Sequence, residues 1–187
     1  MLKYLKLCIV NYMADKKFTV LDLLDLELSG HDALDLKCIA GRRGLPRAIT
    51  VPELNRPGLA LSGFYESFAS NRVQVFGRGE TAYLQKLHKE KNTDSIRNFF
   101  RSQMPCCIFT YNLEPTEDFR KIAEESYCPL LQTSLTSTEF LTVLSVYLQI
   151  SVLHVKLCTA FLLKFTVLVF CFRVTPELVK VKLPLNL

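Results

Sequence analysis

Two apolar runs, each followed by a helical pattern, constrain the fold of this chain most. Within residues 105–151, PCCIFTY and CPLLQTS are the apolar runs, and LEPTEDFRKIAEESY and TSTEFLTVLSVYLQI have helical spacing. Continuous apolar runs are typical of strands buried on both faces of a parallel sheet. Strand, helix, strand and helix in short connections form a βαβ unit with a right-handed crossover. We therefore expect an α/β fold, a small three-layer-like βαβ domain with a partly parallel sheet.

Both helices of this unit carry recognisable start signals. Pro115 stands near the first turn of the first helix, where the missing N–H of proline is tolerated. Thr136 and Glu139 have the spacing of a capping box at the start of the second helix. The residues expected to face the core are Phe119, Ile122 and Ala123 in the first helix, and Phe140, Val143, Leu144, Tyr147 and Leu148 in the second.

The preceding segment predicts shorter elements. FTVLDLLDL predicts a short helix with Thr19 as N-cap and Asp22 at its third position. LKCIAG, residues 36–41, predicts a strand closed by glycine, and a turn-rich stretch follows around a short extended piece at residues 48–51.

NRVQVFG alternates apolar and polar residues. This alternation predicts a strand that is half exposed, with Val73 and Val75 on one face and Gln74 on the other. A helix is expected over residues 80–88. The next segment, HKEKNTDSIRNFFRSQ, is expected to continue as a mostly polar helix with Ile96, Phe99 and Phe100 on one side.

The formal charge of +5 is unevenly placed along the chain. Residues 152–187 hold five Lys or Arg against one Glu, and Lys3 and Lys6 lie near the start, which leaves residues 13–151 at −1. That segment lacks the dense basic stripe that binding to a phosphate backbone requires. We therefore expect no nucleic-acid partner.

The seven cysteines have no spacing typical of metal or disulfide chemistry. Cys106 and Cys107 are adjacent, and no pair has the C-x-x-C separation of a metal knuckle. Reduced thiols in the core of a cytoplasmic protein are the expected state.

Candidate catalytic residues are few. His31 lies in a polar SGHD turn and His88 at a helix end, and neither has a second ligand or a nucleophile at a telling spacing, so both are interpreted as surface histidines. FGRGE follows a strand and precedes a helix, but it lacks the third glycine and the Lys-Ser/Thr pair of a phosphate loop. Gly77 and Gly79 are therefore interpreted as a strand-to-helix turn.

The most distinctive motif is NRPG, which comprises Asn55, Arg56, Pro57 and Gly58. Its role is not evident from its chemistry. We interpret it as a rigid turn in which Pro57 fixes φ and Gly58 is free to take a positive φ, in preference to a ligand site.

Three blocks of the sequence stand out together: FTVLDLLDLELSG, CIAGRRGLPRAITVPELNRPGLALSGFYESFASNRVQVFGRGETAYLQKL and PCCIFTYNLEPTEDFRKIAEESYCPLLQTSLTSTEFLTVLSVYLQIS. They resemble the N-terminal domain of the bacterial HPr kinase/phosphorylase family. The resemblance runs from about residue 17 to residue 151. Its most specific pieces are residues 49–63, residues 71–87 and the turn at residues 113–115.

The resemblance implies that a P-loop kinase domain follows. In this family the second domain holds the catalytic histidine, the phosphate loop and the acidic metal ligands, and the enzyme is a hexamer. It phosphorylates a serine of the phosphocarrier HPr with ATP or pyrophosphate and Mg, reverses this by phosphorolysis, and regulates carbohydrate metabolism through the phosphotransferase system.

The resemblance ends at Val152, after which the sequence has no clear period. Leu157–Phe172 is almost continuously apolar but contains Lys164, and it is shorter than the roughly 20 residues of a membrane-spanning helix. Buried hairpin and poor membrane segment are the simplest interpretations of this stretch.

A third interpretation comes from the genetic code. If codons are read from the third base of each residue and the first two bases of the next, residues 173–181 permit Gly-Asp-Ser-Gly-Ile-Gly-Lys-Ser, a G-x-x-x-x-G-K-S phosphate loop. The same rule permits His-Gly at residues 158–160. We therefore predict that residues 152–187 are a frameshifted, non-native apolar tail, caused by one lost or two gained nucleotides near Ser151.

These interpretations divide the chain into three parts: an upstream extension at 1–12, the HPr kinase/phosphorylase N-terminal-like domain at 13–151, and the tail at 152–187. Without the phosphate loop, the chain is expected to be a truncated, catalytically inactive relative with no cofactor. A homo-oligomer is doubtful, no membrane partner is expected, and the location is expected to be cytoplasmic. The alternatives are a stand-alone regulatory or binding module, a small membrane-associated protein, and a sequencing error in the gene of an intact kinase.

Overall fold

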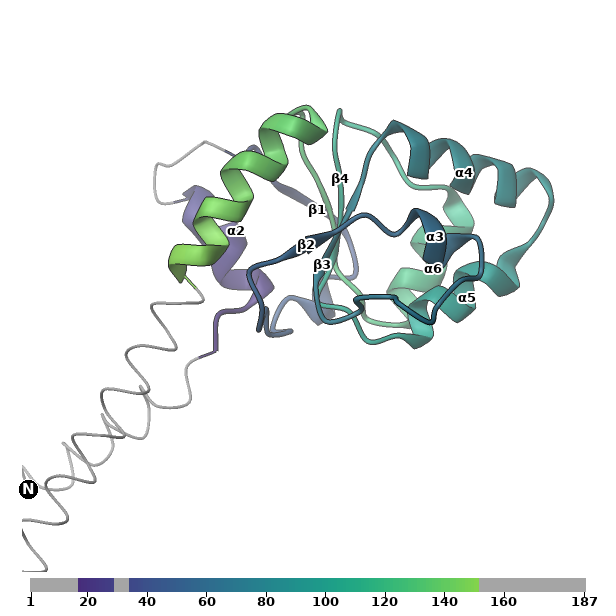
Figure 1. Ribbon diagram of the computed structural model, residues 1–187, viewed down its shortest axis with the longest axis horizontal. Coiled ribbons are helices and arrows are strands. Elements are labelled where there is room, and N and C mark those ends of the chain that lie inside the picture. Colours follow the sequence, from purple (N-terminus) through teal and green to yellow (C-terminus); the bar gives the residue numbers. More distant parts are fainter. Residues whose placement is uncertain (1–16, 29–33, 152–187) are drawn as a thin grey trace, which may run out of the picture. The chain divides into compact units, whose positions relative to one another are not determined.

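A five-stranded sheet forms the centre of the computed structural model, which describes residues 17–28 and 34–151 (Figure 1). The strand order is β1-β5-β4-β3-β2. Neighbouring strands from β2 to β5 are parallel, and β1 pairs with β5 antiparallel. The strands are β1 (Lys37–Ala40), β2 (Leu54–Asn55), β3 (Val73–Phe76), β4 (Cys107–Phe109) and β5 (Leu130–Gln132).

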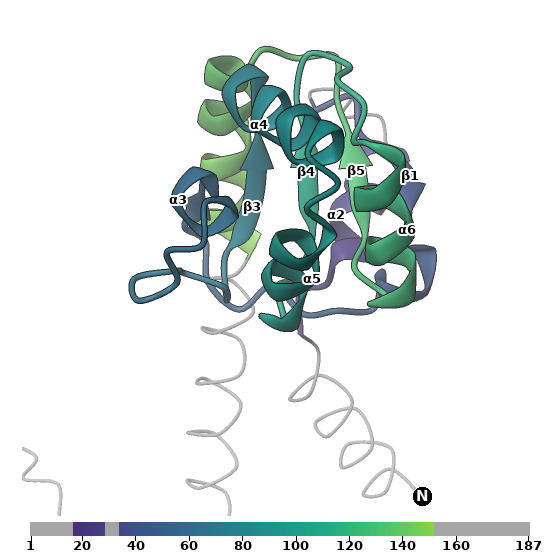
Figure 2. The ribbon, with the colours of Figure 1, turned by 90° about the vertical axis from the view of Figure 1, so that its right-hand side faces the viewer.

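Helices cover both faces of this sheet. On one face lie α3 (Gly58–Leu61), α4 (Arg78–Lys89), α5 (Thr93–Arg101) and α6 (Glu117–Glu125), as Figure 2 shows. On the other face lie α2 (Val20–Leu28) and the helix over residues 137–151 (Figure 1). A short 3-10 turn, Arg42–Gly44, follows β1. The three-layer α/β fold with a partly parallel sheet is thus confirmed.

The predicted half-exposed face of β3 is wrong. All four residues of β3 are buried, and Gln74 is fully buried with them. The reason is that helices pack on both faces of this inner strand, so its polar residue lies inside the protein. The side chain is satisfied by hydrogen bonds, as buried polar groups must be.

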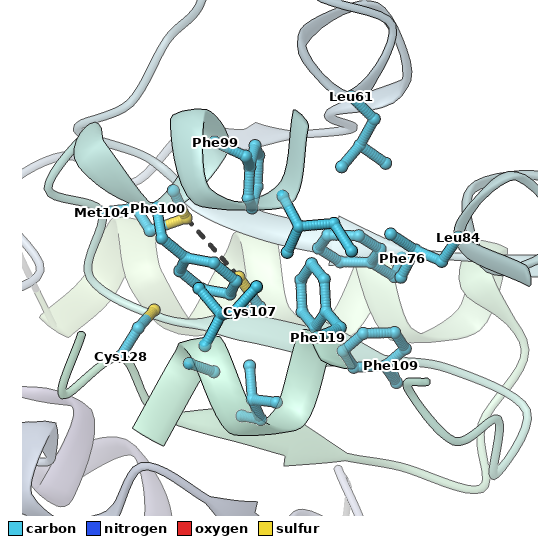
Figure 3. Close-up of a cluster of buried hydrophobic side chains, with 14 of the residues drawn as sticks. Leu61, Phe76, Leu84, Phe99, Phe100, Met104, Cys107, Phe109, Phe119 and Cys128 are labelled. Atoms are coloured by element: carbon cyan, nitrogen blue, oxygen red, sulfur yellow. Dashed lines mark hydrogen bonds between the residues drawn. The ribbon is translucent and has the colours of Figure 1, made fainter. Parts of the chain in front are cut away.

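A cluster of phenylalanine side chains fills the space between the sheet and α3–α6 (Figure 3). Phe119 of α6 lies at its centre, with ring centroids 5.4 Å from Phe76, 4.8 Å from Phe100 and 5.7 Å from Phe109. Such edge-on and tilted contacts add to the burial of a large apolar area. The buried residues of the opposite face include Leu23, Ile49, Val75, Ile108, Leu131, Phe140, Leu144 and Leu148.

Local capping explains where several helices begin. Thr19 and Asp22 hydrogen-bond each other across the start of α2, with the Thr19 N–H donating to Asp22 Oδ2 at 2.8 Å. The capping box predicted for the last helix is also present, since Glu139 Oε2 accepts from the N–H and hydroxyl of Thr136 at 3.2 and 2.7 Å.

Two helix predictions need correction. The polar helix does not continue from α4, because Lys91 has φ 53 and Asn92 starts a new helix by accepting from the Ser95 N–H. Pro115 precedes the N-cap of α6, which is Thr116, instead of occupying the first turn. The expected inward residues of α6 are buried as predicted.

The edge strand β2 was not predicted. An extended piece was expected at residues 48–51, where Ala48 instead forms one isolated bridge with Thr19. β2 has only two residues, too few to show an alternating pattern, and it lies next to the fully buried β3.

No helix within residues 17–28 and 34–151 is long and apolar enough to cross a membrane. The candidate anchor Leu157–Phe172, the predicted extension at 1–12 and the predicted tail at 152–187 lie outside the described residues.

The phenylalanine cluster predicts that replacing a buried phenylalanine costs much more stability than replacing an exposed one. Phe119→Ala should lower the free energy of unfolding by about 3–5 kcal/mol, since it leaves a cavity between four other rings. Phe64→Ala is the control, because Phe64 is exposed, and it should change stability by less than about 1 kcal/mol. Urea unfolding measures both, and equal losses would contradict the packing described.

Candidate functional site

The NRPG motif lies at the edge of the sheet, where β2 ends and α3 begins. Asn55 is the last residue of β2 and pairs in register with Gln74 of β3. Its Nδ2 donates to Gln74 Oε1 at 2.8 Å, while Gln74 Nε2 donates to the carbonyls of Ala69 and Arg72 at 3.0 and 2.8 Å. Asn55 therefore supplies one of the hydrogen bonds that allow an amide to be buried in the core.

Pro57 and Gly58 start the short helix α3. Pro57 is the N-cap with φ −83, and its carbonyl accepts from the Leu61 N–H at 2.9 Å. Gly58 is the first helical residue, and the glycines with positive φ among the described residues are Gly41 and Gly63. Gly58 therefore does not use its freedom to take a positive φ, because the chain enters a helix at this point and does not reverse.

Arg56 forms a bidentate ion pair with Glu80 of α4. Arg56 Nε donates to Glu80 Oε1 at 3.1 Å and Nη2 donates to Oε2 at 2.9 Å. The Glu80 side chain is 9% exposed and that of Arg56 51%. The carboxylate is thus nearly buried, and the guanidinium closes it off from solvent by a two-bond geometry that fixes both side chains.

Glu80 also caps its own helix. Its Oε2 accepts from the backbone N–H of Gly77, the N-cap of α4, at 3.0 Å. FGRGE is therefore a strand-to-helix turn, with Gly77 directly after β3 and Gly79 inside α4. A negative side chain in the first turn also complements the helix dipole.

Gly77 lies in a space that a side chain would fill. A Cβ at this position would approach both Arg56 Nη2 and Ser137 Oγ to 2.8 Å. Ser137 is the first residue of the last helix, and its Oγ lies 2.7 Å from Thr110 Oγ1. The hydroxyl of Thr110 donates to the Phe76 carbonyl at 3.1 Å. One cluster thus joins the residues directly after β2, β3 and β4 to α4 and the last helix.

The protonation of Glu80 reflects this environment. Burial would raise the pKa of its carboxyl group, but hydrogen bonds from Arg56 and from backbone N–H groups, with the positive charge of Arg56, outweigh burial and lower the pKa overall. Glu80 is therefore an ionised structural carboxylate at neutral pH, and not a general acid.

The residues that follow β3, β4 and β5 contact one another at the carboxyl ends of these strands. Tyr111 and Asn112 follow β4 with φ 60 and 51, and their N–H groups donate to the carbonyls of Leu135 and Thr133 at 2.9 and 2.8 Å. The Arg78 guanidinium lies 4.4 Å from the centre of the Tyr111 ring. Ligands of parallel sheets commonly bind at this edge, and here two backbone hydrogen bonds and the Arg78–Tyr111 contact lie at it.

Two pockets lie near these elements. The one beside the motif has a volume of 80 Å³, which fits a single side chain, and is lined by Asn55, Arg56, Leu59, Ala60, Phe64, Ser67 and Phe68. A pocket of 260 Å³ is lined by residues that precede β2, β3 and β4 in the sequence, and by Arg47. The guanidinium of Arg47 is already held by the carbonyls of Met104 and Ser126 at 2.6 and 2.7 Å.

The histidines and the adjacent cysteines are the remaining candidates for catalytic chemistry. His88 is half exposed at the end of α4, and its Nδ1 lies 2.6 Å from Asp118 Oδ2. His31 lies outside the described residues. Burial raises the pKa of the Cys106 and Cys107 thiols well above the usual value, so neither is a reactive thiolate.

Within residues 17–28 and 34–151, no three His, Cys, Asp or Glu side chains are placed to hold a metal ion.

The sequence analysis did not identify the residues that gather around Arg56 and Gly77. Glu80 could have been found, because it stands three residues after Gly77 at a predicted helix start, as a capping carboxylate does. Ser137 and Thr110 carry no such signal. Their meeting depends on how β4 and the last helix pack, which residue types alone do not specify.

A pair of glycine substitutions tests the cluster. Gly77→Ala should lower the free energy of unfolding by about 1–3 kcal/mol, because its Cβ would displace Arg56 or Ser137. Gly79→Ala is the matched control: it is two residues away, its Cβ would meet no atom within 4 Å, and it should stabilise by about 0.4–1 kcal/mol. Chemical denaturation of both variants measures this, and loss of stability in both would contradict the crowding at Gly77.

The Glu80 carboxylate predicts a pH-dependent stability. Its pKa is lower in the folded protein than the value of about 4.3 in an unfolded chain, so its contribution is present above that pH and is lost as pH falls through the folded pKa. The stability difference between the parent and Glu80→Gln should be largest near pH 7 and shrink toward pH 3.

The same difference, measured by urea unfolding in the Arg56→Gln background, should be smaller at pH 7. A pH-independent difference between parent and Glu80→Gln would show that the charge of Glu80 contributes nothing.

Comparison with known proteins gives the family. The family model described as HPr Serine kinase N terminus matches residues 20–148, more than half of the chain. The HPr kinase/phosphorylase of Treponema pallidum (strain Nichols) is 50% identical over 117 residues, and that of Leptospira biflexa 40% identical over 118. Each match covers 63% of this chain and 37% of the relative, so the chain spans little more than a third of the length of these relatives.

A solved structure of the CBS and DRTGG domains of Clostridium perfringens pyrophosphatase matches with a TM-score of 0.44 and 11% identity, over 62% of this chain and 44% of that one. The family model and the curated relatives agree with the resemblance that the sequence blocks carry. The chain belongs to the HPr Serine kinase N terminus family.

Proposed function

We propose that this chain is the N-terminal domain of an HPr kinase/phosphorylase, joined to an out-of-frame translation of the kinase domain. In the intact protein the substrate is a serine of HPr, with ATP or pyrophosphate as phosphoryl donor. The chain as written carries no kinase activity. The observation that supports this most is that the shifted frame permits a G-x-x-x-x-G-K-S sequence, in a chain whose residues 20–148 match the N-terminal family.

The loss of activity follows from the chemistry of phosphoryl transfer. The reaction depends on a backbone cradle around the phosphates, a loop lysine and bound metal ions, and little covalent chemistry is left for other groups. The proposal assigns all of these to the shifted frame. In the described domain, the charges of Arg56 and Glu80 are paired with each other, and this pair links the segment after β2 to α4.

The domain boundaries are part of the same proposal: 1–12 as an upstream extension, 13–151 as the family domain and 152–187 as the tail. The cytoplasmic location expected from the reduced thiols and the family's hexameric assembly belong to the intact enzyme. The Asn55–Gly58 motif then has an architectural role, because its contacts are with Gln74, Glu80 and the start of α3.

A second candidate function is a stand-alone binding module. The well-packed core around Phe119 favours it, because this domain contains its own buried cluster independent of residues 152–187. A specific partner that binds the full chain, and loses binding on a substitution in the described domain, would support this function.

The proposal is tested by an HPr phosphorylation assay with two proteins from one gene. The chain as written should give no phosphorylated HPr. The gene with one nucleotide inserted near codon 151 should yield an active enzyme, and replacing the lysine of its recovered phosphate loop by methionine should abolish that activity. Phosphorylation by the chain as written, or a restored frame that stops before the loop, would overturn the proposal.

A further inference from the structure

The last helix carries no charge over most of its length. Residues 140–151, FLTVLSVYLQIS, contain no Asp, Glu, Lys or Arg, although they form a helix on the outside of the sheet (Figure 1). A helix with one face in water normally places charged residues on that face. The composition is that of a helix covered on more than one side.

The apolar residues of this helix form two adjoining stripes. Phe140, Leu144 and Leu148 are fully buried against the sheet. Val146 and Ile150 are 52% and 62% exposed, and Val143 and Tyr147 between the two stripes are partly exposed. Positions 143, 146, 147 and 150 recur at helical spacing, so they share one face. We call these four residues the outer stripe.

Two hydroxyl groups of the helix, those of Thr142 and Ser145, donate hydrogen bonds to backbone carbonyls of the same helix. Thr142 Oγ1 donates to the Thr138 carbonyl at 2.9 Å, and Ser145 Oγ donates to the Thr142 carbonyl at 2.9 Å. These hydroxyls are satisfied by the helix's own backbone, as they are in helices that lie in apolar surroundings. Burying this side of the helix would leave both groups hydrogen-bonded.

The position of the outer stripe indicates what covers it. Val146 and Ile150 lie in the last two turns, directly before residue 151, where the described part of the helix ends. The matched family is an N-terminal one, and its curated relatives are longer, with the match covering 37% of their length. The polypeptide that follows residue 151 in such a protein is tethered beside this face at high effective concentration.

We propose that the outer stripe is the surface on which the kinase domain of the intact protein docks. This rests on the proposed function, because the docking domain is the one encoded in the restored frame. Its contact surface must itself be apolar and uncharged, since the stripe offers methyl groups and a Tyr147 ring and no charge to pair. Within the described residues, Val146 and Ile150 make the stripe an exposed apolar patch.

Two matched substitutions test the docking. Ile150→Glu places a charge in the outer stripe, and Leu59→Glu places one on α3, on the opposite face of the sheet, where Leu59 is 71% exposed. Both are made in the chain as written and in the frame-restored chain. Thermal unfolding by calorimetry is recorded for all proteins, with HPr phosphorylation by the frame-restored parent as a separate readout.

In the chain as written, both variants should unfold at the parent's temperature. In the frame-restored chain, Ile150→Glu should separate the unfolding of the N-terminal domain from that of the kinase domain and lower its midpoint by at least about 3 °C, while Leu59→Glu should not. An active frame-restored parent whose two variants both unfold like it would overturn the docking and leave the proposed function standing.

Separated transitions together with an inactive parent would overturn the kinase assignment, and with it the proposal that the docking domain is a kinase domain. Self-association of the chain as written, seen by light scattering and abolished by Ile150→Glu, would assign the stripe to a second copy and overturn the proposal.

Discussion

Burial of the central strands on both faces is the constraint on which the rest of this structure depends. β3 and β4 have no exposed residue, so helices must cover the sheet on each side, and α3–α6 do so on one face while α2 and the helix over residues 137–151 do so on the other. The constraint also forces a glutamine into the core. Gln74 is accepted there because Asn55 and two backbone carbonyls satisfy its amide.

The Arg56 cluster follows from the same constraint. The strand-to-helix turn after β3 must be tight, and at Gly77 the space beside it is taken by Arg56 on one side and Ser137 on the other. Glu80 caps that turn and is held by Arg56, which ties the edge of the sheet to α4. The motif that stands out in the sequence therefore makes its contacts within the fold, and its one charged residue, Arg56, is paired with Glu80 of α4.

Patterns that depend on one element were predictable, and contacts between elements were not. The apolar run of β4, the inward face of α6 and the capping box of Thr136 and Glu139 were expected, because each depends on residues within a few positions of one another. The burial of Gln74 and the two-residue strand β2 were not predicted, because both are decided by packing between elements. Val143 and Tyr147 fit the helical pattern but are only partly covered by the described residues, which periodicity alone does not reveal.

The central claim is that a reading frame changes near residue 151, and the nucleotide sequence tests it most directly. The gene and its transcript are read from codon 145 to well beyond codon 187. The account predicts that the frame offset by one base stays open and encodes Gly-Asp-Ser-Gly-Ile-Gly-Lys-Ser across codons 173–181. A stop codon or a different sequence in that frame would contradict it, and the chain would then have to be explained without a kinase domain.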